Sequence, residues 1–407
     1  MTEDIKDTVI LNIGCLVTCS SSKGDPLGIV EGATIHARNG RIMYAGPEKE
    51  APALPAGAQV TDAEKGTVTP GFVDAHTHLA WGGTRADEYE ALAKGVSYAK
   101  IAADGGGIRS TVAATSAALE SPESLLTAMR MRLRDALGWG TTTVEIKSGY
   151  GATPEEELRL LELIATANDS PGLPGVVATY LPLHSPPGTD AKEVIEQVIE
   201  SGIPSAARVA RFIDVFCDEY AWPSSLCEPV LSAARAVGIR RKLHADQLSC
   251  CGGAQLAART GATSADHLDL VDEAGIRELS VHAVTAVLTP ATSLTLGSKP
   301  APAASLIEAG VPIAIATDRN PGTCNCSSMP LVMSLGVALY RIPPHVVLLA
   351  ATAGGARALD LPDRGTLVPG MRADMVLWPT RDWRDITYQM GIRPGLVMWA
   401  DRSETTG

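Results

Sequence analysis

The chain has 407 residues, of which 45% are hydrophobic and 20% charged, so it can bury a large core and is not expected to be disordered. Its formal net charge is −12 and no basic patch is visible, which argues against nucleic acid or an anionic membrane as a partner. The chain lacks any apolar run of roughly 18 residues, and its acidic start (MTEDIKDTVI) does not resemble an export signal, so we expect a cytoplasmic protein without a membrane span.

The two ends of the chain are similar in character and differ from the middle. Asn39-Gly40 lies between two alternating runs near the start, which is a strong signal for a β-hairpin. Strand candidates occur at 8–17, 33–45, 373–378 and 395–399. We therefore expect segments 1–67 and 364–407 to form one small β-sandwich domain.

The middle of the chain, 68–363, alternates helices with short β-rich runs. Ser121-Pro122 begins a helix that ends near Gly138, and Thr153-Pro154 with Glu156 forms a capping box for the next helix. Eight β-rich runs are found at 70–77, 141–147, 176–184, 209–217, 239–245, 262–267, 283–289 and 311–318. Eight βα units predict an α/β fold with a closed (β/α)8 TIM barrel. The alternative, an open doubly wound sheet, is disfavoured because its Gly-rich dinucleotide fingerprint is absent.

The eight cysteines form no CxxC pair, and a long chain without an export signal is expected to keep its thiols free and buried.

The histidines give the first indication of chemistry. His76-Thr77-His78 ends the first β-rich run, and side chains at positions i and i+2 of a strand project to the same face. By itself this motif fits a pair of ordinary histidines as well as it fits a metal site. However, His184, His244 and His267 end the third, fifth and sixth runs, at the rim where barrel active sites are assembled.

Asp318 ends the eighth run, so His76, His78, His244 and Asp318 together offer three nitrogens and one carboxylate to a divalent transition ion. Such an ion is expected to lower the pKa of a bound water from about 16 toward about 7 and so to generate hydroxide. Sites of this kind that hold two metal ions commonly use a carboxylated lysine at the end of the fourth strand. In this chain the corresponding segment, 216–219, contains no lysine. We therefore expect one metal ion, with His267 beside it as a non-ligand partner.

Several longer segments carry a resemblance to a known family. They are PGFVDAHTHLAWGGTRADEY (70–89), GGGI (105–108), EIKSGYG (145–151), HADQLS (244–249), SADHLD (264–269), ATDRNPGT (316–323) and RGTLVPGMRADMVLW (364–378). The chain resembles the amidohydrolase superfamily and, within it, the imidazolonepropionase family of histidine degradation. HTH and the final Asp are typical of the whole superfamily, whereas GGTRADE, KSGYG and DxNPG are more specific.

The resemblance implies hydrolysis of the cyclic amide of 4-imidazolone-5-propanoate to N-formimidoyl-L-glutamate by a metal-bound hydroxide. It implies one Zn(2+) or Fe(2+) ion held by His76, His78, His244 and Asp318, with Asp318 and His267 as catalytic residues. Arg85 would pair with the substrate propionate, because a forked guanidinium suits a carboxylate. The other implied substrate-binding residues are Tyr150, His184, Gln247, Asn320, Gly322 and Thr323. The substrate would be a small anionic heterocycle, and a homodimer is the expected assembly.

The chain departs from many family members at Gln247, where they have Glu. An amide cannot act as a general base, so proton transfer would fall to Asp318 or His267, while Gln247 could still hydrogen-bond the ring. Two other functions stay open: another mononuclear amidohydrolase, such as a heteroaromatic base deaminase, or a barrel scaffold without catalysis. Gln247 disfavours the first, and the full ligand set disfavours the second.

Overall fold

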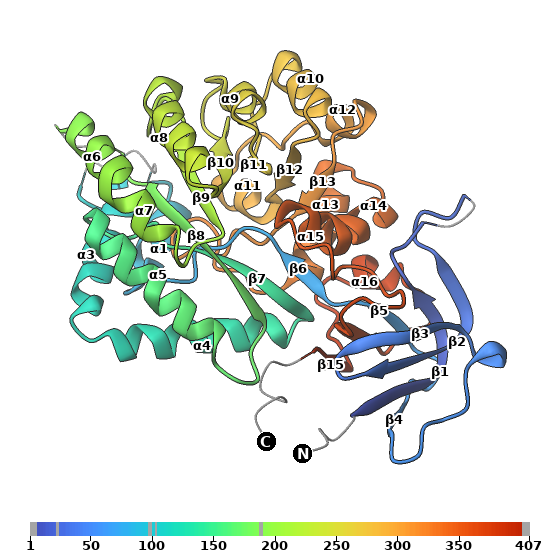
Figure 1. Ribbon diagram of the computed structural model, residues 1–407. Helices are drawn as coiled ribbons and strands as arrows, with labels where there is room; N and C mark the ends of the chain where they lie inside the picture. Colours follow the sequence, from blue (N-terminus) through green and yellow to red (C-terminus); the bar gives the residue numbers. More distant parts are fainter. Residues whose placement is uncertain (1–5, 22–23, 97–99, 102–103, 187–189, 401–407) are drawn as a thin grey trace.

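The computed structural model describes residues 6–21, 24–96, 100–101, 104–186 and 190–400. The outermost parts of the expected terminal domain, 1–5 and 401–407, therefore lie outside the described residues. Two sheets organise the fold: a barrel surrounded by helices and a smaller sheet beside it that contains strands from both ends of the chain (Figure 1).

The larger sheet confirms the predicted barrel. Its eight parallel strands follow each other in chain order. They are β6 (Phe72–Asp74), β7 (Thr141–Lys147), β8 (Gly175–Leu183), β9 (Phe212–Cys217), β10 (Arg240–Ala245), β11 (Ser264–His267), β12 (Thr285–Leu288) and β13 (Ile313–Ile315). The first and last strands meet beyond their C-terminal ends, where the amide of Asp318 bonds to the carbonyl of His76 at 3.0 Å. The barrel is thus closed by the same residues that carry the predicted metal ligands.

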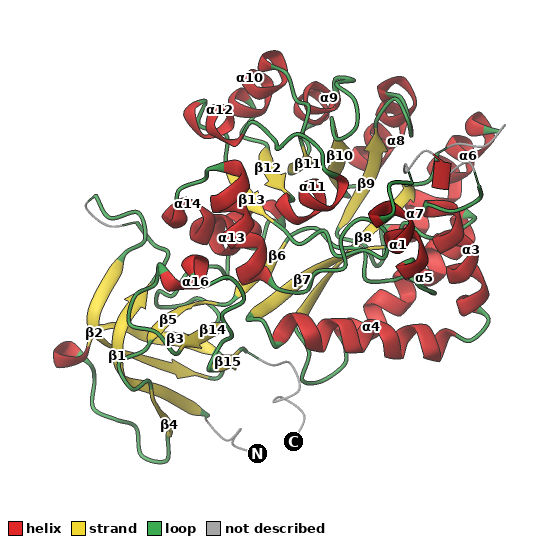
Figure 2. Ribbon diagram, turned by 180° about the vertical axis from the view of Figure 1, so that it is seen from behind, coloured by secondary structure: helices red, strands yellow, loops and turns green. Residues whose placement is uncertain are grey.

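Helices surround the barrel and cover its outer face (Figure 2). The longest, α4, begins at Pro122 and buries Met129 and Leu133, as its apolar spacing predicts. In α5, the side chain of Thr153 accepts a hydrogen bond from the amide of Glu156, which confirms the N-cap half of the predicted capping box, while the Glu156 carboxylate accepts from the amide of Ala152.

The described α-helices are α1 (Ala86–Ala93), α3 (Ile108–Leu119), α4 (Pro122–Leu137), α5 (Pro154–Asn168), α6 (Ala191–Gln197), α7 (Ile203–Ala206), α8 (Ser224–Ala236), α9 (Gly253–Thr260), α10 (Glu273–Val281), α11 (Pro290–Leu296), α12 (Ala303–Glu308), α13 (Met329–Tyr340), α14 (Pro344–Leu349), α15 (Gly355–Ala358) and α16 (Asp385–Tyr388). A 3-10 turn, η1 (Glu48–Glu50), and two π-helical turns, η2 (Val198–Gly202) and η3 (Ala350–Gly354), complete the helical segments. Within the described residues, no helix is long and apolar enough to cross a membrane.

The predicted first strand, 70–77, is wrong as a single element. Pro70 ends β5 (Thr67–Pro70) in the smaller sheet, and β6 begins only at Phe72. The amide of Gly71 between them bonds to Asp374 at 2.9 Å, so the chain passes from one sheet to the other at this glycine. His76 and His78 consequently lie beyond the regular strand.

The smaller sheet joins the two ends of the chain, as the sequence predicts. Its strands are β1 (Asp7–Val17), β2 (Ile29–Arg38), β3 (Arg41–Pro47), β4 (Gln59–Asp62), β5, β14 (Met375–Trp378) and β15 (Leu396–Met398). Asn39 and Gly40 have positive φ angles of 49° and 70° in the two-residue turn of the β2–β3 hairpin, the geometry that such turns require. The sequence predicts a sandwich, whereas the observed strands form one branched sheet. The branch arises because the first part of β1 pairs with β4 and its last part pairs with β5.

The eight cysteines all lie in the described part of the chain and are free thiols, as expected. Five are buried, but Cys251 and Cys326 are half-buried and Cys250 is exposed, so the expectation of burial is wrong for these three.

Candidate active site and metal centre

Four predicted metal ligands converge at the C-terminal end of the barrel. Nε2 of His78 lies 3.3 Å from Nε2 of His76 and 3.3 Å from Nε2 of His244. Oδ1 of Asp318 lies 3.6 Å from Nε2 of His76 and 3.5 Å from that of His78. Zinc–nitrogen bonds of about 2.0–2.1 Å in a tetrahedral shell place neighbouring donors roughly 3.3 Å apart. The buried donors form two overlapping sets that could each hold a metal ion, His76 with His78 and His244, and His76 with His267 and Asp318.

Buried carboxylates hold the remote nitrogens of two of these imidazoles. Nδ1 of His76 donates to Asp266 at 2.6 Å, and Nδ1 of His244 donates to Asp214 at 3.0 Å. Each of these bonds leaves Nε2 with its lone pair directed at the site, as metal ligation requires. Burial also lowers the pKa of His76 well below its usual value, so the ring is neutral.

His267 and Asp318 offer ligand atoms within 4.8 Å of each other and of His76, and both residues have unusual backbone conformations. Their φ angles are 77° and 49°, in the left-handed region that non-glycine residues rarely adopt. The hydroxyl of Thr292 donates to Oδ2 of Asp318 at 2.6 Å, and the Thr289 hydroxyl lies 3.0 Å from Nδ1 of His267. Burial raises the pKa of Asp318 to about 7. Nε2 of His267 is buried and meets no hydrogen-bond partner among the described residues, so it is available to a bound ligand.

Arg85 is held against the loop that carries Asp318. Its Nε and Nη2 atoms bond to one oxygen of Glu88 at 2.8 and 2.7 Å. The other oxygen of Glu88 accepts from the amide of Gly107 at 3.0 Å and from Ser110 at 3.1 Å. Nη1 of Arg85 packs against Gly322, where a Cβ atom would collide with it. The GGGI segment thus orients Glu88, and Glu88 orients Arg85.

Tyr150 and His184 lie on another side of the ligand cluster. The His184 ring stacks on His78, with ring centroids 4.7 Å apart and planes 14° apart, and its Nδ1 donates to the Gly149 carbonyl at 2.7 Å. The Tyr150 ring lies 5.3 Å from that of His184. Glu157 accepts from the amides on both sides of Tyr150, those of Gly149 and Gly151. Burial raises the pKa of Glu157 to about 7.

The remaining predicted residues occupy two loops. Oδ1 of Asn320 accepts from the amides of Gly322 at 2.9 Å and Thr323 at 2.7 Å, so this side chain shapes its own loop. Gln247 is half-buried after β10, and its carboxamide makes no hydrogen bond within the part of the chain that the structure describes. Its loop is anchored at Asp218, which accepts from the amide of Leu248 at 2.9 Å.

Sequence reasoning missed the residues that support the ligands, including Asp214, Asp266 and Glu88, and gave no role to Lys147. A signal for the strand residues was present. Charged residues recur at alternate positions of otherwise apolar strands, as in Glu145 and Lys147. Alternate positions share one face of a strand, and a charged face can be buried only inside the barrel, where its groups pair with one another.

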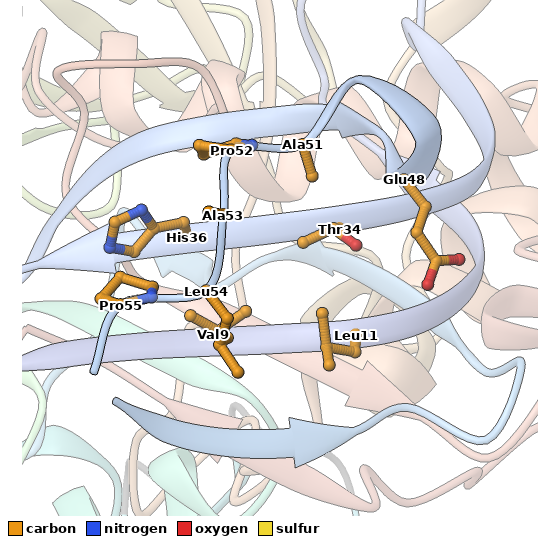
Figure 3. Close-up of a pocket in the computed structure, with 10 residues that line it drawn as sticks. All are labelled: Val9, Leu11, Thr34, His36, Glu48, Ala51, Pro52, Ala53, Leu54 and Pro55. Atoms are coloured by element: carbon orange, nitrogen blue, oxygen red, sulfur yellow. The ribbon is translucent and has the colours of Figure 1, made fainter. Parts of the chain in front are cut away.

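A separate cavity of about 210 Å³ lies in the terminal sheet (Figure 3). It is lined by Val9 and Leu11 of β1, Thr34 and His36 of β2, Glu48 of η1 and residues 51–55. Among these residues is one histidine, whose Nε2 atom lies 2.6 Å from Asp7, and none of the predicted ligands. The candidate metal donors lie instead at the barrel rim.

Comparison with known proteins agrees with this geometry. A profile of the amidohydrolase family matches residues 67–398. The chain is 42% identical over 384 residues to an imidazolonepropionase of Xanthomonas oryzae, covering 93% of this chain and 94% of the relative. It is 39% identical over 399 residues to an imidazolonepropionase of Anaeromyxobacter dehalogenans, covering 96% and 94%.

Solved structures with a similar fold include an adenosine deaminase from Xanthomonas campestris with bound zinc, at a TM-score of 0.69 and 20% identity, covering 97% of this chain and 92% of that one. A mutant atrazine chlorohydrolase from Arthrobacter aurescens, complexed with zinc and atraton, has a TM-score of 0.69 and 18% identity, with 97% and 94% covered. At such identities the likeness concerns the fold alone.

A closed barrel with a histidine–carboxylate cluster at the ends of its strands, matched by the family profile over most of its length, defines the chain as an amidohydrolase. Its similarity to curated relatives at 39% and 42% identity over nearly the whole chain is more specific. The chain belongs to the imidazolonepropionase family and is a hydrolase.

Proposed function

We propose that this chain hydrolyses 4-imidazolone-5-propanoate to N-formimidoyl-L-glutamate. The observation that carries the proposal is the contact between Arg85 and Gly322, which holds a guanidinium against the loop that begins at Asp318. A carboxylate bound by Arg85 would bring an attached heterocycle close to the converging histidines. A forked guanidinium is well suited to that carboxylate.

His76, His78, His244 and Asp318 would hold one divalent transition ion, and a shell of three nitrogens and one oxygen suits Zn(2+) or Fe(2+). The ion would supply Lewis-acid activation of water and of the amide carbonyl. Burial would lower the pKa of Lys147, but Asp214, Glu145 and Asp266 raise it on balance. Its ion pairs with Glu145 at 2.7 Å and Asp214 at 2.6 Å support an ammonium at Lys147 in place of a carboxylated ligand for a second ion.

Side chains of the protein would carry out the proton transfers. Asp318 would take the proton from the attacking water as the carbon–oxygen bond forms, and would pass it to the ring nitrogen as the carbon–nitrogen bond breaks. Nε2 of His267 would hydrogen-bond the oxygen on which negative charge develops. Gln247, His184 and Tyr150 would contact the ring. Because Gln247 carries no titratable proton, the arrangement favours ring hydrolysis over deamination.

The proposal includes a cytoplasmic location and a homodimer, the commonest symmetric assembly. Gel filtration coupled to light scattering would measure the mass of the purified chain.

The decisive experiment measures turnover of freshly generated imidazolone propionate together with metal content. We expect product formation at one metal equivalent per chain and no ammonia release from heteroaromatic amines. His267→Asn should retain the ion and lower kcat, because His267 is assigned no ligand role. Ammonia release without imidazolone turnover would refute the proposed reaction, and a requirement for two ions would refute the single-metal site.

A further inference from the structure

A layer of buried charge lies directly beneath the four metal-ligand candidates. Nζ of Lys147, at the end of β7, is 2.7 Å from Glu145, 2.6 Å from Asp214 and 3.7 Å from Asp266. These carboxylates come from β7, β9 and β11, and all four side chains have no exposed surface. The ammonium of Lys147 therefore contacts carboxylates from three strands of the barrel.

Two of the three carboxylates are the groups that hold ligand imidazoles. Asp214 faces Lys147 with Oδ2 and His244 with Oδ1. The Asp266 oxygen that is 3.7 Å from Lys147 is the same oxygen that accepts from Nδ1 of His76. Lys147 is thus linked through Asp214 to His244 on β10, and through Asp266 to His76, which follows β6. No hydrogen-bonded pairing joins these two strands in the sheet.

We propose that Lys147 is a positioning residue that fixes the relative placement of His76 and His244 through Asp266 and Asp214. This inference rests on the proposed metal-dependent function and specifies how its ligand geometry is maintained. Without the Lys147 ammonium, Glu145 and Asp214 would lose their shared lysine and Asp266 would keep only Lys242, so the buried carboxylates would repel one another and would have to move or bind a proton. Either change would release the imidazoles from the orientation in which both Nε2 atoms face the same point.

Lys242 offers a comparison within the same layer. Its Nζ bonds to Ser264 at 2.8 Å and to the carbonyl of Ala75 at 3.2 Å, and it lies 3.5 Å from Asp266. It is equally buried, but its ion pair is with Asp266 and it has none with Asp214. A lysine that only neutralises buried charge would behave like Lys242. A lysine that couples two ligands would affect metal binding more strongly.

The test replaces Lys147 and measures metal binding independently of turnover. Lys147→Met removes the ammonium while keeping an unbranched apolar chain. A double variant combines Lys147→Met with Glu145→Gln and so also removes one uncompensated carboxylate. The amide side chain of the new glutamine keeps an oxygen that can accept the hydrogen bond from the Thr77 amide, which Glu145 accepts at 3.2 Å. Lys242→Met is the matched control. Cobalt affinity is measured by chelator competition, ligand geometry by the visible absorption spectrum of the cobalt protein, and stability by thermal unfolding of the metal-free protein.

We expect both variants without Lys147 to bind cobalt about 10- to 100-fold more weakly and with an altered spectrum, since that is the usual effect of losing support for metal ligands. Lys242→Met should lose less affinity. Wild-type affinity and spectrum in the folded double variant, with only its unfolding temperature lowered, would overturn the proposal and leave the proposed function intact. Failure of the wild-type chain to bind cobalt would refute the proposed metal site, and this inference with it.

Discussion

The metal side and the substrate side of the site are supported in different ways. On the metal side, His76 and His244 are held by fully buried carboxylates of strands β11 and β9. On the substrate side, Arg85 lies at the start of a helix and pairs with Glu88, which is itself held by the amide of Gly107. Tyr150 lies in a loop that Glu157 fixes by accepting the amide of Gly149. Charge fixed on a strand resists displacement because moving it would unpair other buried charges. A loop fixed by a few amides can change without unfolding the barrel.

This difference predicts that changes on the metal side abolish the site, whereas changes on the substrate side alter affinity and leave the metal in place. The following variants test the comparison in order of expected effect.

His244→Ala should cause the largest loss. It removes one of the four converging donors and leaves Asp214 without its imidazole partner, so both bound metal and turnover should fall by several orders of magnitude. Metal analysis and turnover measure the effect. His282→Ala is the control, because His282 is exposed at the end of α10. Full metal content in His244→Ala would contradict the ligand assignment.

Asp318→Asn separates ligation from proton transfer. The amide keeps an oxygen near the histidines but cannot accept a proton, so kcat should fall by at least about 10²-fold while metal is retained. Pre-steady-state turnover with parallel metal analysis measures both properties. A variant with its metal and a near-normal rate would show that the proton travels by another route.

Arg85→Ala should leave the metal side intact and weaken the substrate side. Loss of a charge-assisted pair of about 2–3 kcal/mol predicts a fall of roughly 10²-fold in kcat/KM. Steady-state kinetics and metal content together measure the effect. Unchanged kinetics would mean that a different group binds the substrate carboxylate.

Glu88→Gln tests whether the orientation of Arg85 matters as well as its charge. The amide no longer forms an ion pair, so the guanidinium loses its fixed position, and KM should rise by about tenfold, or roughly 1.4 kcal/mol. Glu90→Gln on the same helix is the control, since Glu90 pairs with Lys94 on the exposed surface. Equal effects in the two variants would indicate a general change in charge and not a loss of orientation.

Gln247→Glu should have the smallest effect. If the residue only hydrogen-bonds the ring, the fold and metal content should persist, and kcat should rise by no more than a few-fold. That is well below the roughly 10²-fold contribution of a general base. A rise in kcat of roughly 10²-fold would instead assign the general-base role to residue 247 and not to Asp318.

The barrel was predictable because its evidence is local. Helical periodicity, the capping box at Thr153 and the eight short β-rich runs each occupy a single stretch of sequence. The single strand predicted at 70–77 failed because apolar composition does not reveal that Gly71 transfers the chain between two sheets. The candidate ligands were also predictable, since residues at the C-terminal ends of parallel strands must meet at one rim.

The supporting contacts were not predictable in the same way. His76 and its partner Asp266 are 190 residues apart, and Lys147 and Asp214 are 67 residues apart. A charged residue in a buried strand must find a partner, but the sequence does not say which of several inward-facing groups will be close enough. The number of strands and the relative tilt of neighbouring strands determine that pairing.

The sequence by itself thus determined the class of fold, the family, and which side chains are chemically able to bind a metal, because these depend on residue type and short-range spacing. Only the tertiary structure decided that the donors converge at 3.3–3.6 Å, that Glu88 orients Arg85, and that Lys147 joins the supports of two ligands. The physical reason is that these relations depend on distances between atoms of different strands and loops, and barrel closure brings those atoms together.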